Sequence, residues 1–310
     1  MSSMRPPPAP SAARPDPMSG GRAFLLLVAA AVLYGGIFPV NRLAAEAGWP
    51  AIAFALMPAL LGGLGLLAAG ARLSAAPRAV LAHLVIGGLV IGLPIGILVR
   101  AAEHLPASTL TLVLCLSPIL TLAIAAATGS ERLDRRVLAG MVLGSLGIAL
   151  IVWPDSGVVG QGGVRWFLLA LLAPVMFALA NNCAVWLRPP ATPAVAMAAG
   201  TLLGGAAVAA VVALLLGARF WPEATGGAQI LPLVLSALIN AIFFWLFFRL
   251  VEVIGPARFS LFNYLAVAAG ILWSMLVFRE VPAPVFWLAA ALMLAGMHLA
   301  LRRPKAVSRP

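Results

Sequence analysis

The feature that most constrains how this chain folds is a set of polar residues that occurs twice at a constant spacing. Four residues are matched by an identical residue 149 positions later: Arg100 by Arg249, Glu103 by Glu252, Glu131 by Glu280, and Gly147 by Gly296. Only 9% of the residues are charged, so four matches at one offset, three of them between charged residues, are not expected by chance. The chain is therefore predicted to be a tandem duplication of one structural unit.

The composition places both units in a membrane. Apolar residues make up 63% of the chain, whereas soluble domains contain about 45–50%. The formal net charge of +11 does not indicate a nucleic-acid partner, because the chain holds one lysine and no basic run within a folded segment. Cys115 and Cys183 lie in apolar runs and are expected to be small buried residues, with no disulfide, metal or cofactor. The expected surroundings are the lipid bilayer.

The apolar runs set the predicted fold class. A helix needs about 20 apolar residues to cross the hydrocarbon core of a bilayer. Ten runs are of roughly this length, at residues 23–41, 50–70, 79–99, 106–128, 136–153, 166–187, 193–217, 228–248, 257–278 and 282–301. They predict an all-α polytopic membrane protein with ten transmembrane helices, arranged as two inverted five-helix repeats.

The predicted segments follow from the glycine-rich linker near residue 160, which separates the first five spans from the last five. They are a disordered tail over 1–22, the first repeat over 23–155, an external linker over 156–165, the second repeat over 166–301, and a basic tail over 302–310. A single repeat holds an odd number of spans, so the second repeat enters the membrane in the opposite orientation. Inverted repeats are typical of transporters, whose midplane site opens alternately to each side.

The positions of the basic residues predict which side is cytoplasmic. With the N-terminus inside, 15 of the 20 Lys and Arg residues lie on the cytoplasmic side, and this bias satisfies the positive-inside rule. Both termini are therefore predicted to be cytoplasmic.

Polar side chains inside the spans are the candidates for a substrate site, because they are costly in hydrocarbon unless they face a cavity or a partner. Ser and Thr can bond the carbonyl of their own helix, but the amide of an asparagine cannot be satisfied in that way alone. Two interpretations stay open for the asparagines, a bond between helices and the lining of a polar site. The candidate substrate-binding residues are Tyr34, Asn181, Asn182, Asn240, Asn263 and Tyr264.

Two Arg-x-x-Glu pairs end the third and eighth spans, Arg100 with Glu103 and Arg249 with Glu252. Residues three apart lie on one helix face, so each pair is most simply a local ion pair. The alternative is a gate whose partners change between two states, because the pairs fall at opposite membrane faces. His83 lies alone in its apolar span and is expected to form a hydrogen bond between helices rather than a proton relay.

Several motifs together resemble the EamA-type family of the drug/metabolite transporter superfamily. They are residues 33–41 (LYGGIFPVN), residues 100–108 (RAAEHLPAS) leading to 116–118 (LSP), and Glu131 followed by Gly140, Gly144 and Gly147. The resemblance covers nearly the whole chain and implies two inverted five-helix repeats. It also implies an exporter of amino acids or other small-molecule metabolites at the inner membrane of a bacterium.

An enzyme is the alternative class, together with a non-transporting membrane partner protein. Intramembrane catalysis needs a nucleophile, a metal or a carboxylate cluster at one depth, and the sequence holds no His-Glu-x-x-His, paired Asp or Gly-x-Ser-x-Gly motif. The chain is therefore expected not to be an enzyme. A homodimer is compatible with the sequence.

None of the nine acidic residues is predicted to lie near the middle of a span. Proton-driven carriers commonly place a carboxylate there. The expected mechanism is therefore facilitated export or exchange, without an obligatory proton.

Topology can be tested by cysteine labelling in a chain from which Cys115 and Cys183 have been removed. A cysteine at Gly160 is expected to react with a membrane-impermeant thiol reagent added to intact cells, because the positive-inside rule places the linker outside. Protection at Gly160 together with labelling at Ser130 would reverse the predicted orientation.

Overall fold

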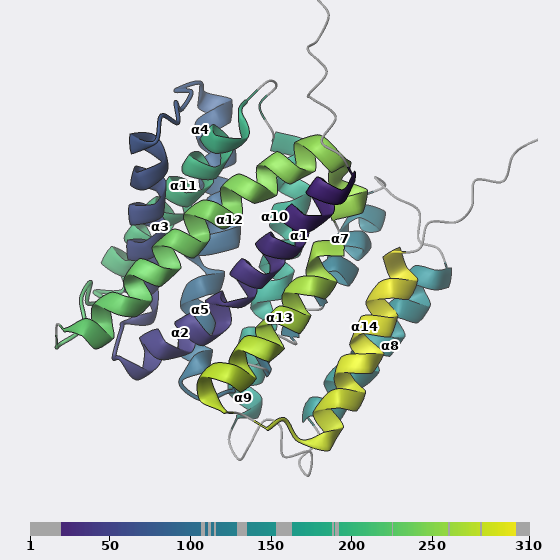
Figure 1. Cartoon of the computed structure of the whole chain (residues 1–310). Helices are drawn as coiled ribbons and strands as arrows, with labels where there is room; N and C mark the ends of the chain where they lie inside the picture. The colour runs from purple at the N-terminus through teal and green to yellow at the C-terminus, as the bar shows by residue number, and fades with distance from the viewer. Residues whose placement is uncertain are drawn as a thin grey trace, which may run out of the picture.

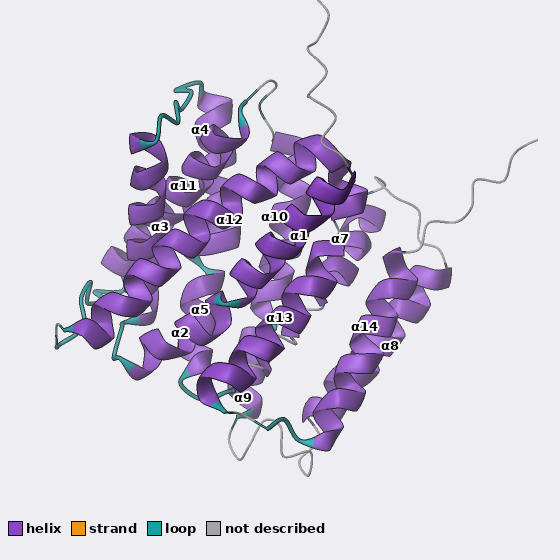
Figure 2. Ribbon diagram, in the orientation of Figure 1, coloured by secondary structure: helices purple, strands orange, loops and turns teal. Residues whose placement is uncertain are grey.

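The computed structural model describes residues 20–106, 109–110, 113–114, 116–128, 135–152, 163–187, 189, 192–224, 226–259, 261–279 and 281–301. Within these ranges all the regular secondary structure is helical and no strand is present (Figure 2). The predicted all-α fold class is confirmed.

The helices follow one another as antiparallel passes through one bundle (Figure 1). Those of the first half are α1 (Gly20–Gly35), α2 (Ile37–Glu46), α3 (Ala51–Ala68), α4 (Pro77–Gly87), the π-helix η1 (Gly88–Gly92), α5 (Pro94–Ala102), α7 (Leu116–Ala127) and α8 (Arg135–Val152). Those of the second half are α9 (Val164–Ala170), α10 (Leu172–Leu187), α11 (Ala194–Leu215), α12 (Gly227–Phe259), α13 (Leu261–Phe278) and α14 (Pro284–Leu301).

Several of the predicted spans are interrupted helices in the described residues, and a proline accompanies the breaks in the first, third and sixth spans. Proline has no N–H to donate and its ring crowds the carbonyl four residues earlier, so the helix bends or breaks there. Pro39 lies just after the break between α1 and α2, and Pro174 just after the break between α9 and α10. In the third span the chain widens into η1 ahead of Pro94, and the N–H of Leu93 donates to the carbonyl of Gly88 at 3.0 Å.

Six helical segments in the described ranges are long and apolar enough to cross a membrane. They are Leu25–Glu46, Ala51–Ala68, Pro77–Ala102, Val164–Cys183, Ala194–Leu215 and Gly227–Leu250. The other four predicted spans overlap α7, α8, α13 and α14. The protein therefore crosses the membrane several times, and the total of ten spans stays a prediction.

Both ends of the helical bundle lie at the same face. Helix α1 begins and α14 ends at the upper face in Figure 1, the face that also carries the 70–76 connection, while the turns around residues 48, 220 and 281 lie at the lower face. These two faces are called the predicted cytoplasmic face and the predicted external face below. The alternation of the loops matches the sequence prediction, and the assignment of the faces to the two sides of the membrane stays a prediction.

The contact between α8 and α14 relates the two halves directly (Figure 1). A Cβ built on Gly147 would lie 3.0 Å from the carbonyl oxygen of Ala289, and one built on Gly296 would lie 2.6 Å from that of Gly140. Gly140 and Ala289 are 149 residues apart, as are Gly147 and Gly296. Each contact therefore recurs with the halves exchanged, as at a two-fold interface. The end of one helix meets the beginning of the other, so these equivalent helices run antiparallel, as an inverted repeat requires.

The other packing contacts also come in exchanged pairs. Helix α3 packs on α12, and its equivalent α11 packs on α4. Helix α1 packs on α13 and α12, and its equivalent α10 packs on α7 and α4. A pseudo-two-fold relation between the repeats thus extends through the bundle.

The closest approach between the halves is the crossing of α4 and α11. A Cβ on Gly204 would collide with the carbonyl of His83, and one on Gly87 would collide with the carbonyl of Thr201. Glycine is required at both positions because the two backbones touch, and small residues are what let helices approach this closely in lipid.

Replacing Gly204 with alanine tests this crossing. Alanine favours a helix over glycine by about 1 kcal/mol, but the Cβ at this position must displace backbone, so Gly204→Ala is expected to destabilise the protein by about 1–3 kcal/mol. The matched control is Gly65→Ala in α3, where a Cβ meets no atom within 4 Å. Thermal unfolding of the purified variants measures both, and equal melting temperatures would contradict the close crossing.

Candidate substrate site between the repeats

A cluster of aromatic rings joins the first helix of one repeat to two helices of the other. The ring of Tyr34 in α1 stacks on that of Phe243 in α12, with centroids 4.0 Å apart and planes inclined by 27°. Phe38 in α2 and Phe262 in α13 lie 6.3 and 5.9 Å from the same ring. Tyr34 therefore packs among three further aromatic rings, and its predicted role in substrate binding stays a prediction.

The break between α1 and α2 positions this cluster. Gly35 lies against α13, where a Cβ would come within 2.8 Å of the Cβ of Ala269. The indole N–H of Trp273 in α13 donates to the carbonyl of Val32 at 2.9 Å. The lack of a side chain at Gly35 and the hydrogen bond from Trp273 hold α1 against α13, and Tyr34 faces α12.

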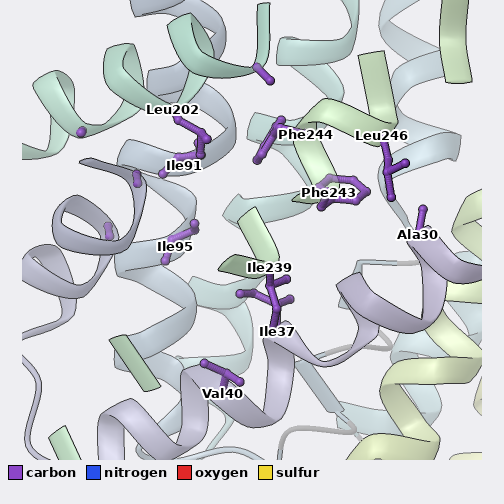
Figure 3. Packing of buried hydrophobic residues seen from close by; sticks show 14 of the residues in the cluster. Ala30, Ile37, Val40, Ile91, Ile95, Leu202, Ile239, Phe243, Phe244 and Leu246 are labelled. Atoms are coloured by element: carbon purple, nitrogen blue, oxygen red, sulfur yellow. The ribbon is translucent and has the colours of Figure 1, made fainter. Parts of the chain in front are cut away.

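Helix α12 runs antiparallel to α1 and α2 at a fixed register. Tyr34 meets Phe243, Gly36 lies near Ile239, and the indole N–H of Trp49 donates to the carbonyl of Gln229 at 2.9 Å. Figure 3 shows Ile37 and Ile239 meeting just below Phe243. Residues later in α2 therefore contact residues earlier in α12.

Asn240 lies close to this aromatic cluster in α12. It precedes Phe243 by three residues, so both side chains share one face of α12. Asn240 is buried, and its Nδ2 donates to Oγ of Ser236 at 3.3 Å. The structure therefore brings Tyr34 and Asn240 to the same region.

Asn181 and Asn182 lie in a different contact, between α10 and α7. Nδ2 of Asn182 donates to the carbonyl of Ala178 at 2.9 Å and to that of Thr121 at 3.3 Å. Nδ2 of Asn181 reaches Oγ1 of Thr121 at 3.3 Å from an exposed position. Of the two interpretations left open by the sequence, the contacts of Asn182 are those of a bond between helices. The side chains of Asn263 and Tyr264 lie outside the described part of the structure.

The first Arg-x-x-Glu pair forms the expected ion pair at the predicted external face, between Arg100 and Glu103. The imidazole of His104 stacks on the indole of Trp166 with centroids 4.1 Å apart, and the guanidinium of Arg100 lies 5.3 Å from that indole. The pair is thus tied to the first turn of α9 in the other repeat. The contact between His104 and Trp166 was not predicted, because neither residue belongs to the repeated polar pattern in the sequence. Arg249 is exposed, and the side chain of Glu252 lies outside the described residues.

A pocket of about 440 Å³ opens at the predicted external face, away from these residues. It lies between the turn after α2 and the connection from α11 to α12, and its charged lining residues are Glu46, Arg219 and Glu223. Glu46 pairs with Arg42 at 2.9 Å, and Glu223 pairs with Arg219. None of the predicted substrate-binding residues lines it.

At Nδ1 of His83 the expected hydrogen bond between helices is not formed. This nitrogen atom is buried and has no hydrogen-bond partner among the described residues. The reason is the close crossing of α4 and α11, where a Cβ on Gly200 would collide with the imidazole ring. The ring packs against glycine, which offers no side-chain group to bond.

Asn182 and Asn181 form a matched pair for testing the contact between α10 and α7. Asn182→Ala is expected to destabilise the protein by about 1 kcal/mol, as is typical of bonds between helices in membranes. Asn181→Ala, at an exposed position, is expected to change stability by less than about 0.5 kcal/mol. Thermal unfolding of the two purified variants measures both changes in stability. An unchanged melting temperature for Asn182→Ala would show that Asn182 does not stabilise the contact between α10 and α7.

Comparisons with known proteins agree with this architecture. The model of the EamA-like transporter family matches residues 21–153 and again residues 164–302, once in each half. No curated protein matches the chain. A solved structure described only as "Crystal structure of protein" is 24% identical, with a TM-score of 0.60 over 91% of this chain and 97% of that one, and shows the fold. Since the family model matches both halves, this chain belongs to the EamA-like transporter family.

Proposed function

We propose that this membrane transporter exports amino acids or related small metabolites across the inner membrane of a bacterium. Membership of the family supports a transporter of the drug/metabolite type and a multi-pass membrane location. The substrate class and the outward direction are parts of the proposal. The expected partners are a small-molecule substrate and the surrounding lipid.

The observation that carries the proposal is the exchange of contacts between the repeats. Helix α1 packs on α13 and α12, as α10 packs on α7 and α4. Two equivalent sets of contacts allow the protein to close one side while the other opens, which is how inverted repeats expose a midplane site alternately. The side chains differ between the two sets of contacts. Aromatic rings fill the contact between α1 and α12, whereas a hydrogen bond from an asparagine to a threonine carbonyl joins α10 to α7.

The chemistry of the site favours a small amphipathic molecule. Tyr34 and Phe243 offer ring faces, and Asn240 offers amide hydrogen bonds, with no charged side chain among the rings and amides that define the site. An uncharged site of this kind suits a neutral or zwitterionic molecule with an apolar part. We assign substrate binding to Tyr34 and Asn240 first, and to Asn181, Asn182, Asn263 and Tyr264 as candidates from the sequence.

The alternative of an intramembrane enzyme has no specific observation in its favour. In the ranges that the structure describes, no three His, Cys, Asp or Glu side chains are grouped so as to hold a metal ion. The family of the chain is a transporter family.

Counterflow of radiolabelled amino acids in proteoliposomes tests the proposal. The wild-type protein is expected to catalyse exchange of at least one amino acid, and Tyr34→Leu and Asn240→Leu are each expected to reduce the rate about tenfold, as loss of about 1.4 kcal/mol of binding does. Leu238→Ala, at an exposed position on the same helix, is the control. Absence of exchange for all twenty amino acids would refute the substrate class.

The driving force is tested in the same liposomes with an imposed pH gradient and a clamped potential. We expect no uphill accumulation, because Glu103 pairs with Arg100 at the predicted external face rather than lying buried at the midplane. Accumulation that Glu103→Gln or Glu252→Gln abolishes would identify the Arg-x-x-Glu pairs as the site of proton coupling.

A further inference from the structure

Asn41 has a buried polar atom with no hydrogen-bond partner in the part of the chain that the structure describes. Asn41 in α2 is only 3% exposed, and its Oδ1 accepts no hydrogen bond from any described residue. A buried carbonyl oxygen without a donor costs free energy that folding must recover elsewhere, so such groups are rare in native structures. The position therefore calls for a donor that comes from outside the protein.

The register of the helices places Asn41 in the candidate substrate site. Asn41 follows Ile37 by four residues, so the two share one face of α2. Ile37 meets Ile239 of α12 (Figure 3). One turn further along α2 corresponds to one turn earlier in α12, because the helices are antiparallel. Asn41 therefore lies at the depth of Ser236, the residue to which Asn240 donates.

A second acceptor lies close by in the chain. Pro39 has no N–H, so the carbonyl of Gly35 loses the donor that an uninterrupted helix would provide. The broken first span thus has two oxygen atoms six positions apart, the carbonyl oxygen of Gly35 and Oδ1 of Asn41, and Phe38 between them lies near the ring of Tyr34. In broken transporter helices, freed carbonyls of this kind face cations and other donors.

Two further buried polar atoms have no hydrogen-bond partner within the described ranges, and they lie in a different setting. They are Nδ1 of His83 and Oγ1 of Thr201, both at the crossing of α4 and α11. The backbones touch there, since a Cβ on Gly87 would collide with the carbonyl of Thr201. No room is left for a ligand at that crossing, so Thr201 provides an internal comparison for Asn41.

We propose that Asn41 is a substrate-binding residue whose Oδ1 accepts a hydrogen bond from an N–H group of the transported molecule. The ligand class is a primary ammonium compound with an apolar part, in which the ammonium donates to Asn41 and Gly35 and the apolar part contacts the rings. This assignment rests on the proposed transport function, and it identifies the ammonium as the group of the substrate that the site recognises.

Stability and transport together test the assignment. Asn41→Leu removes an unsatisfied buried oxygen and is expected to raise the melting temperature of the purified protein by about 2 °C or more. It is expected to lower counterflow of radiolabelled leucine about tenfold, as loss of one such bond does. Thr201→Val also removes an unsatisfied oxygen and is expected to raise the melting temperature without changing counterflow.

The nature of the donor is tested with the N,N,N-trimethyl analogue of leucine, which keeps both charges and has no N–H. Leucine is expected to compete about tenfold better than this analogue in the wild-type protein. The advantage of leucine is expected to be smaller in Asn41→Leu, where the carbonyl of Gly35 is the remaining acceptor. Equal competition in the wild-type protein would overturn the role of the N–H donor.

Accessibility provides a readout that does not depend on the transported compound. In a chain without Cys115 and Cys183, a cysteine at position 41 is expected to react with a water-soluble methanethiosulfonate, and one at position 201 is not. A melting temperature lowered by Asn41→Leu, as for a structural bond, would overturn the assignment, as would unchanged counterflow or an unreactive cysteine at position 41. If wild-type protein does not exchange leucine, the proposed substrate class fails for leucine while the labelling still decides whether Asn41 lines an aqueous path.

Discussion

The lack of water in the bilayer core is the constraint on which this structure depends. A backbone N–H or carbonyl exposed to hydrocarbon has no solvent partner, so each crossing segment must bond its own backbone as a helix. Helices satisfied in this way have little hydrophobic reason to associate in lipid, and close packing must hold them together. Glycine provides that packing here, at Gly87 and Gly204 between α4 and α11 and at Gly147 and Gly296 between α8 and α14. The two repeats therefore pack most closely at these glycines, which have no side chain to keep the helices apart.

The same constraint explains where the function lies. Backbone that departs from a regular helix is tolerated in a membrane only where protein or a water-filled cavity surrounds it. The chain departs from regularity at Gly36 before Pro39, in the π-helix before Pro94, and at Leu171 before Pro174. The first of these breaks lies between Tyr34 and Asn41, the aromatic and amide groups of the candidate site. A helix break and a buried oxygen without a partner among the described residues, Oδ1 of Asn41, thus occur together with the groups expected to bind substrate.

Sequence alone predicted the fold class, the duplication and the alternation of the loops, because apolar length and repeat spacing are local properties. It also proposed Tyr34 and Asn240 as substrate-binding residues, because they are polar groups in apolar spans, and this role stays a prediction. It could not rank the asparagines, since the bond from Asn182 to Thr121 depends on how α10 packs on α7. The stacking of His104 on Trp166 was missed for a similar reason. Burial without a partner, as at Asn41, is visible only once the neighbours are in place.

The proposed alternating access requires that α1 and α2, which continue one span, move against α12 during transport, so the contact between α2 and α12 must open and close. The most direct measurement is reversible cross-linking of Ile37→Cys to Ile239→Cys in a chain without Cys115 and Cys183, at a position where the two side chains meet (Figure 3). Amino-acid counterflow in proteoliposomes is compared between the oxidised and reduced states of this one protein. Oxidation is predicted to stop counterflow and reduction to restore it. Complete cross-linking with unchanged counterflow would contradict alternating access at this contact.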